Sequence, residues 1–214
     1  MSEHPFRRPA VVLAASLALA WTAAAQTAIP ARAPDLPAAP GTKWVVDPVH
    51  SQVEFGIRHL LGRVRGSFTR WYGVIATRDS DWTNGTVKVK VQTTSINTGN
   101  SYRDADLRSP RFLDAAGFPA MTFESTDITA TDSTVVIGGN LTLKGHTHYV
   151  VLKGQFRGIG KDKEGKERIA FDASTVLDRH DFGIDYNEMV EGSKLIGDDV
   201  EITIALEAVR APDK

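Results

Sequence analysis

Hydrophobic and polar residues alternate along most of the chain. In "TVKVKVQ", Val87, Val89 and Val91 share one face, whereas Lys88 and Lys90 share the other. The same period of two recurs in "SQVEFGIR", "LTLK" and "VEITIALE". Strict alternation is typical of antiparallel strands that have one dry face and one wet face. It predicts eight strands, at about residues 51–59, 63–78, 85–95, 119–129, 133–144, 147–159, 167–178 and 199–209.

The turns and strand lengths favour a closed barrel. Asn84-Gly85, Lys144-Gly145 and Glu164-Gly165 are turn signals between the predicted strands. Eight antiparallel strands with short turns form either a sandwich or a barrel. Long strands that carry Gly66 and Gly73 suit a barrel that coils sharply, and closure removes exposed edges. We therefore predict an all-β fold, an eight-stranded antiparallel β-barrel, which is either filled by side chains or holds one small ligand.

One segment between strands, "NTGNSYRDADLRSPRFLDAAGFPAM", does not alternate. Ser101 and Asp104 resemble a capping box, and Ser109-Pro110 is a second helix start. Gly117 and Pro119 form a stop signal. These signals predict two short helices, at about residues 101–108 and 110–116.

The predicted helical insert, residues 101–118, would cover one end of the barrel with Phe112, Leu113 and Phe118. It is either a plug that completes the core or a lid over a pocket.

The N-terminus has the organisation of a secretory signal peptide. Arg7 and Arg8 precede the apolar run "AVVLAASLALA", and Ala23 and Ala25 form an A-x-A pattern before Gln26. A transmembrane anchor is the rival interpretation, but the run is about half of the roughly 20 apolar residues that a spanning helix needs. We predict a cleaved signal peptide and export to the periplasm. The chain then divides into a signal peptide at 1–25, a Pro/Ala-rich linker at 26–42 and a barrel domain at 43–210.

Composition removes several function classes. The net charge of the 214-residue chain is -1, which gives no electrostatic case for nucleic-acid binding. Cysteine is absent, which excludes disulfides, thiolate catalysis and Cys-ligated metal. The chain has no Walker loop, no G-x-G-x-x-G and no G-x-S-x-G elbow.

The densest polar motif is "GHTHYV", in which His146 and His148 would share one face of a strand. They could supply two metal ligands, or they could be the solvated end of a hairpin. Asp47, His50 and Ser51 form a triad on paper, but adjacent strand residues point to opposite faces. We predict no catalytic residue, no metal and no cofactor. The alternative is a metal-dependent or hydrolytic enzyme that uses the His-bearing end of the barrel.

Several motifs together resemble the YceI-like family of lipid- and polyisoprenoid-binding proteins. They run in the family's order from Trp44 to about Val209, as "WVVDPVHSQVEFGIRHL", "RGSFTRWYG", "SINTGNSYRDADLRS", "DADLRSPRFLDAAGFPAMTFES", "GNLTLKGHTHYV" and "RHDFGI". The resemblance implies a lipocalin-like barrel with a long apolar tunnel for an isoprenoid chain, in a protein exported to the periplasm. Beyond "DFGI", the acidic segment 179–198 has no clear counterpart in the family.

The expected partner is therefore a long-chain isoprenoid or similar lipid, held for transport, storage or sequestration. Each methylene moved from water to an apolar wall contributes about 0.8 kcal/mol, so a dry tube needs no strong polar contact to hold such a chain. The sequence leaves the oligomeric state open, with a homodimer as one option. The predicted lining residues are inward-facing apolar residues: Phe55, Ile57, Phe68, Val89, Phe112, Leu113, Phe118, Met121, Phe123, Leu141, Leu143, Phe156, Phe171, Phe182, Ile202 and Ile204.

Overall fold

The computed structural model describes residues 42–212 except 79–80 and 191, so the predicted signal peptide and all but the last residue of the predicted linker lie outside the described residues. The strands are β1 Thr42–Val46, β2 Gln52–His59, β3 Gly62–Phe68, β4 Trp71–Arg78, β5 Asp81–Gln92, β6 Ile96–Asn97, β7 Ala120–Thr131, β8 Thr134–Leu143, β9 His146–Lys161, β10 Glu167–Asp178, β11 Met189–Val190, β12 Ser193–Lys194 and β13 Ile196–Arg210. The helices are α1 Ser101–Leu107 and the 3-10 turns η1 Thr93–Ser95 and η2 Arg179–Phe182. No helix in the described part of the chain is both long and apolar enough to span a membrane.

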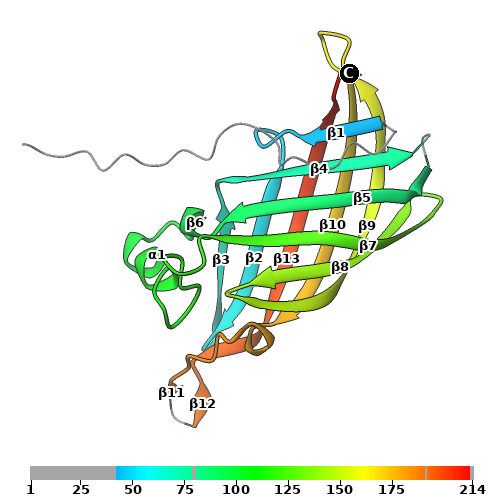
Figure 1. Ribbon diagram of the computed structural model, residues 1–214. Helices are drawn as coiled ribbons and strands as arrows, with labels where there is room; N and C mark the ends of the chain where they lie inside the picture. Colours follow the sequence, from blue (N-terminus) through cyan, green and yellow to red (C-terminus); the bar gives the residue numbers. More distant parts are fainter. Residues whose placement is uncertain (1–41, 79–80, 191, 213–214) are drawn as a thin grey trace, which may run out of the picture. The chain divides into compact units, whose positions relative to one another are not determined.

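The strands close into the predicted eight-stranded antiparallel barrel. β1, β4, β5, β7, β8, β9, β10 and β13 are hydrogen-bonded in that order, and β13 pairs with β1 to complete the circuit (Figure 1). β13 is longer than β1, and its first two-thirds pair with β2 instead. β2 and β3 therefore extend the wall beyond the closed ring, on the side where α1 lies.

The predicted strand 63–78 is two strands, β3 and β4, separated by a bend at Thr69 and Arg70. The bend has backbone partners, because Thr69 N donates to Ser95 O and Gln92 N donates to Arg70 O. The sequence pattern also missed the short strands β1, β6, β11 and β12.

The predicted register of the barrel is confirmed on β5. Val87 and Val91 are buried, Lys90 is exposed, and Lys88 forms an ion pair with Glu124 on the outside. The alternation therefore distinguished the inner from the outer face of the barrel.

Helix α1 begins at Ser101 as predicted, but Ser101 is not its cap as the capping-box pattern suggests. The cap is Asn100, whose Oδ1 accepts hydrogen bonds from Tyr102 N and Arg103 N, both at 3.1 Å. Asp104 serves the preceding loop instead, because its Oδ1 accepts from Thr98 N and Thr98 Oγ1.

The second predicted helix, 110–116, is wrong; these residues form successive turns. Leu113 N donates to Leu107 O and Ala115 N donates to Arg108 O, which ties the chain back onto α1. Asp114 has a φ of +44°, which no α-helix allows. Tertiary hydrogen bonds thus override the Ser109-Pro110 start signal.

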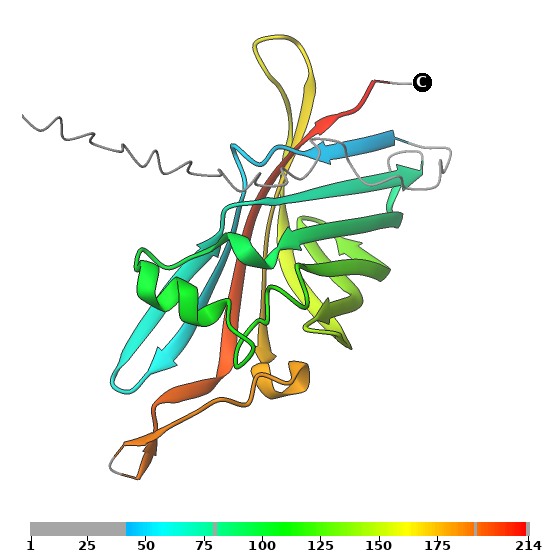
Figure 2. The same cartoon turned by 60° about the vertical axis from the view of Figure 1, so that its left-hand side comes forward.

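The insert packs as a plug at one end of the barrel (Figure 2). Arg108 donates to Thr94 O and Ile96 O, which fixes the insert to η1 and to β6. Phe112 and Leu113 are buried in the main core cluster. Phe118 does not face the barrel as predicted, because its side chain is 37% exposed and lies over Gly145 of the β8–β9 turn.

Candidate functional site

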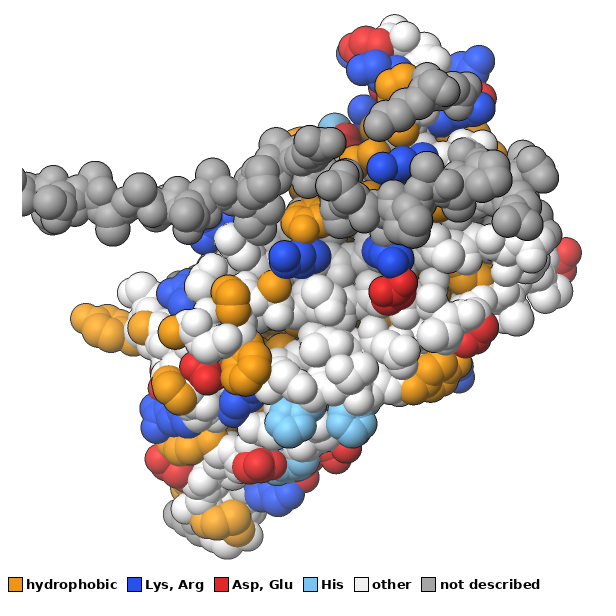
Figure 3. Space-filling view, viewed as in Figure 1, with side chains coloured by type: hydrophobic (Ala, Val, Ile, Leu, Met, Phe, Trp, Pro, Cys, Tyr) orange, Lys and Arg blue, Asp and Glu red, His pale blue; other side chains and the backbone are white. Residues whose placement is uncertain are grey.

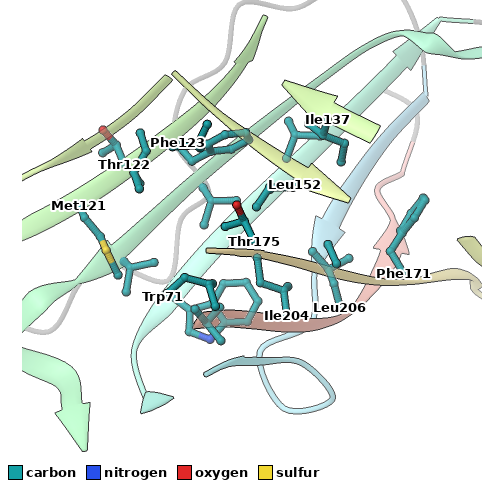
Figure 4. A pocket seen from close by; sticks show the side chains of 18 of the residues that line it. Trp71, Met121, Thr122, Phe123, Ile137, Leu152, Phe171, Thr175, Ile204 and Leu206 are labelled. Carbon is teal, nitrogen blue, oxygen red and sulfur yellow. The ribbon is translucent and has the colours of Figure 1, made fainter. Parts of the chain in front are cut away.

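The barrel encloses a cavity of about 150 Å³. Its walls come from the inner faces of strands all around the barrel (Figure 4). The lining residues are Val53, Phe68, Trp71, Ile75, Val87, Val89, Val91, Met121, Thr122, Phe123, Ile128, Val135, Ile137, Leu141, Val150, Leu152, Phe171, Ala173, Thr175, Leu177, Ile202, Ile204 and Leu206.

The cavity wall is almost entirely apolar, since the hydroxyls of Thr122 and Thr175 and the indole N–H of Trp71 are the only polar groups on its lining side chains. On β10, Phe171, Ala173, Thr175 and Leu177 alternate along the strand and all line the cavity. These inward-facing side chains are only half-buried, whereas Ile75 and Val87 on the opposite wall are buried. The incompletely packed part of the cavity therefore lies along β10 and its neighbours.

The structure divides the predicted lining residues into two groups. The first group lines the cavity: Phe68, Val89, Met121, Phe123, Leu141, Phe171, Ile202 and Ile204. The second group does not: Phe55, Ile57, Phe112, Leu113, Phe118, Leu143, Phe156 and Phe182.

Side chains of the second group pack against neighbours instead. Phe112 meets Tyr186 edge to face at 5.1 Å between ring centroids, and Phe182, which is 1% exposed, meets His148 at 5.3 Å. Leu143 and Leu113 are both buried in the main core cluster. These residues form the floor of the barrel, so they close the cavity without lining it.

Three further residues of the second group, Phe55, Ile57 and Phe156, lie on the inner face at other heights, whereas Phe118 lies over Gly145. Phe156 packs against Phe171 at 5.1 Å between ring centroids. Phe55 packs against Phe68 at 5.9 Å, and its ring crosses Gly66, where a Cβ would lie 2.6 Å from the ring. Ile57, next along β2, pairs with β3 and β13 beyond the cavity.

Many lining residues were missed by the sequence reasoning although they follow the same alternation. Val87 and Val91 flank the predicted Val89, and Leu206 follows Ile204 on β13. Trp71 and Ile75 lie in "RWYGVIAT", where the assumed single strand obscured the face of each residue. Extending the alternation along the whole of each strand would have identified most of these lining residues.

Comparisons with known proteins agree with this architecture. The sequence profile of the YceI-like domain matches residues 44–208. The chain belongs to the YceI-like family. A UPF0312 protein of Pseudomonas paraeruginosa is 35% identical over 162 residues, covering 75% of this chain and 82% of that protein. A UPF0312 protein of Pectobacterium atrosepticum is 35% identical over the same length with the same coverage.

Solved structures share the YceI-like fold. The Campylobacter jejuni YCEI protein matches with a TM-score of 0.64 and 29% identity over 73% of this chain and 91% of that chain. BcnA of Burkholderia cenocepacia matches with a TM-score of 0.67 and 21% identity, over 76% and 98%. A polyisoprenoid binding domain from Saccharophagus degradans matches with a TM-score of 0.62 and 15% identity, over 78% and 98%.

One polar cluster of this YceI-like barrel has converging ligand atoms. Among the described residues, the only group of three suited to a metal is Asp47, His50 and Glu207. Arg168 already occupies the cluster, donating to Asp47 at 2.8 Å and to Glu207 at 2.5 Å. Burial raises the pKa of Asp47, but hydrogen bonds from Arg168 and His50 outweigh it and hold that pKa at about 2. Arg168 also pairs with Asp162, so the cluster is an ion-pair network in which three carboxylates share one guanidinium.

The triad suggested by Asp47, His50 and Ser51 does not form. His50 Nδ1 lies 2.8 Å from Asp47 Oδ2, but the Ser51 hydroxyl bonds to the backbone of Glu207 on β13. Ser51 therefore ties β13 to the β1–β2 connection.

Histidine side chains gather near η2, at one end of the barrel (Figure 3). His146 and His148 are exposed, and His146 lies against Gly183. His180 has a carboxylate on each ring nitrogen, Asp185 at Nδ1 and Asp198 at Nε2. Hydrogen bonds to Asp185 and then to Asp198 raise the pKa of His180.

Arg179 fixes the same segment from inside the barrel. Its side chain is 3% exposed and donates to Gly197 O, Ile184 O, Tyr186 O and Asp198. The acidic segment 179–198 is therefore organised around a buried guanidinium, which gives it a structural role at the floor of the barrel.

Proposed function

We propose that this YceI-like protein binds a long apolar lipid of the polyisoprenoid type inside the barrel, without catalysis, for transport, storage or sequestration in the periplasm. The observation that carries the proposal is the cavity inside the barrel, which has almost no polar lining. Such a wall suits an apolar ligand, and its few polar groups belong to Thr122, Thr175 and Trp71.

The size of the cavity bears on the ligand. A volume near 150 Å³ is comparable to a cavity that takes up one benzene-sized molecule. A longer chain therefore needs side chains to move outward as it enters. Half-buried Phe171, Leu177 and Met121 border the space, and Met in particular adapts to irregular gaps.

The free energy of burial favours a long apolar chain that lies along such a wall. Each methylene buried contributes about 0.8 kcal/mol, so a chain of several isoprene units gains enough to offset some rearrangement of the wall. The name of the Saccharophagus degradans neighbour, a polyisoprenoid binding domain, supports the ligand class. The signal-peptide pattern of residues 1–25 supports the compartment.

The test is organic extraction of the purified protein followed by mass spectrometry, with elemental analysis of the same sample. We expect a co-purified isoprenoid or related long-chain lipid and no stoichiometric metal. A protein that carries bound metal and no extractable lipid would replace this function with the metal-dependent alternative.

A further inference from the structure

One histidine at the floor of the barrel lies between two carboxylates. His180, in η2, has Asp185 Oδ1 2.8 Å from its Nδ1 and Asp198 Oδ1 2.9 Å from its Nε2. A hydrogen bond from His180 lowers the pKa of Asp185, and bonds from Lys194 and His180 hold the pKa of Asp198 at about 2. Ionised carboxylates only accept hydrogen bonds, so each ring nitrogen must donate. An imidazole donates from both nitrogens only in its protonated form.

The two carboxylates connect the ring to two different elements. Asp198 lies near the start of β13. Asp185 lies in the floor loop, residues 183–188, which runs from η2 to β11. One protonated ring therefore ties η2 both to the barrel wall and to the loop that follows it.

The floor loop helps to close the core next to the cavity. Ile184 is buried in the core cluster, and Tyr186 packs against that cluster and meets Phe112 of the insert edge to face. Asp185 stands between Ile184 and Tyr186 in the chain. Just before η2, Leu177 of β10 lines the cavity. The bridged ring thus holds the segment that lies between the cavity wall and the insert.

Loss of the second proton breaks one of the two ties. A neutral ring keeps one N–H, so one carboxylate then faces a lone pair of the ring and is repelled. Asp198 has other partners, since it also pairs with Lys194 and with Arg179. Asp185 is 74% exposed, and within the described part of the chain its only ion pair is with His180.

Other bonds hold the floor loop at every pH between 5 and 9. Arg179 donates to Ile184 O and Tyr186 O. Lys144 Nζ donates to Gly183 O at 2.8 Å. Lys and Arg keep their charge well above neutral pH. The loop therefore stays attached when the ring is neutral, and it is held less firmly.

Two further histidines and one carboxylate adjoin the ring. On β9, His146 lies against Gly183 and His148 meets Phe182 edge to face (Figure 3). Asp178 caps η2 by accepting from His180 N. His146 and His148 also titrate near neutral pH, so a test must separate them from His180.

We propose that His180 is a proton-operated clamp: its imidazolium form keeps the floor loop closed, and its neutral form lets the loop open so that lipid enters and leaves faster. The inference rests on the proposed function, because it names how access to the same cavity is regulated.

The direction of the response follows from the charges around the ring. Hydrogen bonds to Asp185 and then to Asp198 raise the pKa of His180, whereas burial and the charge of Arg179 oppose the rise. The imidazolium is therefore present below about pH 6.5 and is lost as the pH rises through the folded pKa. The clamp should hold in mild acid and loosen in mild alkali.

The test measures how fast a bound dye leaves the protein between pH 5 and 9. Delipidated protein, expressed from its complete sequence, is loaded with N-phenyl-1-naphthylamine, an apolar dye that is uncharged in this range. It is then mixed with phosphatidylcholine vesicles, which take up the released dye. We expect release at pH 9 to be at least about fivefold faster than at pH 5, since a charge-assisted hydrogen bond is lost.

Two variants should abolish the pH response. His180→Gln removes the titrating ring. Asp185→Asn changes an exposed side chain, and its amide can accept from the protonated ring or donate to the neutral one, so the tie survives at both pH values. Asp181→Asn is the matched control, because it changes a neighbouring exposed carboxylate of η2 and should keep the response. His148→Gln should keep it as well.

The outcomes separate the clamp from lipid binding itself. Dye release at one rate from pH 5 to 9, or an unchanged response in Asp185→Asn, would overturn the clamp and leave lipid binding standing. A response that disappears in His148→Gln and persists in His180→Gln would also overturn it. A protein that takes up no dye at any pH and holds no extractable lipid would remove the proposed function, and the clamp with it.

Discussion

Filling the cavity from within should stabilise the lipid-free protein. Ala173 is a suitable position, because it lies on the inner face of β10, lines the cavity and is only half-buried. Ala173→Leu adds three carbons that point into existing space. The same substitution removes room for a ligand.

The magnitude follows from the volume of the cavity. An unfilled cavity of 150 Å³ costs on the order of 3.6 kcal/mol at about 24 cal/mol per Å³. Three added carbons recover about 2.4 kcal/mol at about 0.8 kcal/mol each, and fixing a leucine side chain costs about 0.5–1 kcal/mol. The net gain is about 1.5 kcal/mol, which raises Tm by about 3–6 °C for a domain of this size.

The assay is thermal unfolding of delipidated protein, followed by circular dichroism, together with lipid content by extraction. Ala173→Leu should raise Tm and lower the amount of co-purified lipid. Ala208→Leu is the matched control, because Ala208 lies on β13 with 0% exposure and does not line the cavity. Overpacking there should cost about 1–3 kcal/mol.

If Ala173→Leu destabilised the protein as much as Ala208→Leu does, the inner face of β10 would be packed in solution. The cavity would then be too small to matter, and the argument for an apolar ligand would lose its basis.

Three further outcomes are expected at the plug and the floor of the barrel. Asp104→Ala should cost about 1–3 kcal/mol in urea unfolding, because it leaves two donors of half-buried Thr98 without their acceptor. Arg179→Lys should cost about 3–5 kcal/mol, since one ammonium cannot replace the forked donor among its several acceptors; a loss under 1 kcal/mol would contradict this. His180 has a raised pKa in the folded state, so its contribution is fully present below about pH 6.5 and is lost as pH rises through the folded pKa. When Tm is measured from pH 5 to 9, it should therefore fall less at the alkaline end in His180→Gln than in wild type. Identical Tm profiles in the two proteins would refute the role of the two flanking carboxylates.

The sequence alone determined which face of each strand is dry. Alternation is a local property: successive side chains on a strand point to opposite sides whatever the rest of the chain does. Val87, Val89 and Val91 therefore face inward as predicted, and Lys90 faces out. The order of the motifs was also sufficient to identify the family.

Helix boundaries in the insert depended on more than local signals. Asn100 caps α1 through a local hydrogen bond that the sequence could have revealed. The second helix fails because Leu113 and Ala115 bond back to α1, and such partners exist only in the folded chain. The helix start signal at Ser109-Pro110 is local, so it carries no information about these tertiary hydrogen bonds.

Only the tertiary structure decided how deep along the barrel each inward residue lies. Leu141 and Leu143 share a face of β8, yet Leu141 lines the cavity and Leu143 is packed in the floor. Strand tilt and closure set that depth, because they determine which residues of neighbouring strands come level with one another. The pairing of Leu60 with the base of a hairpin more than 120 residues later has the same origin. A period of two fixes the direction of a side chain, and the closed circuit of hydrogen bonds fixes what it meets there.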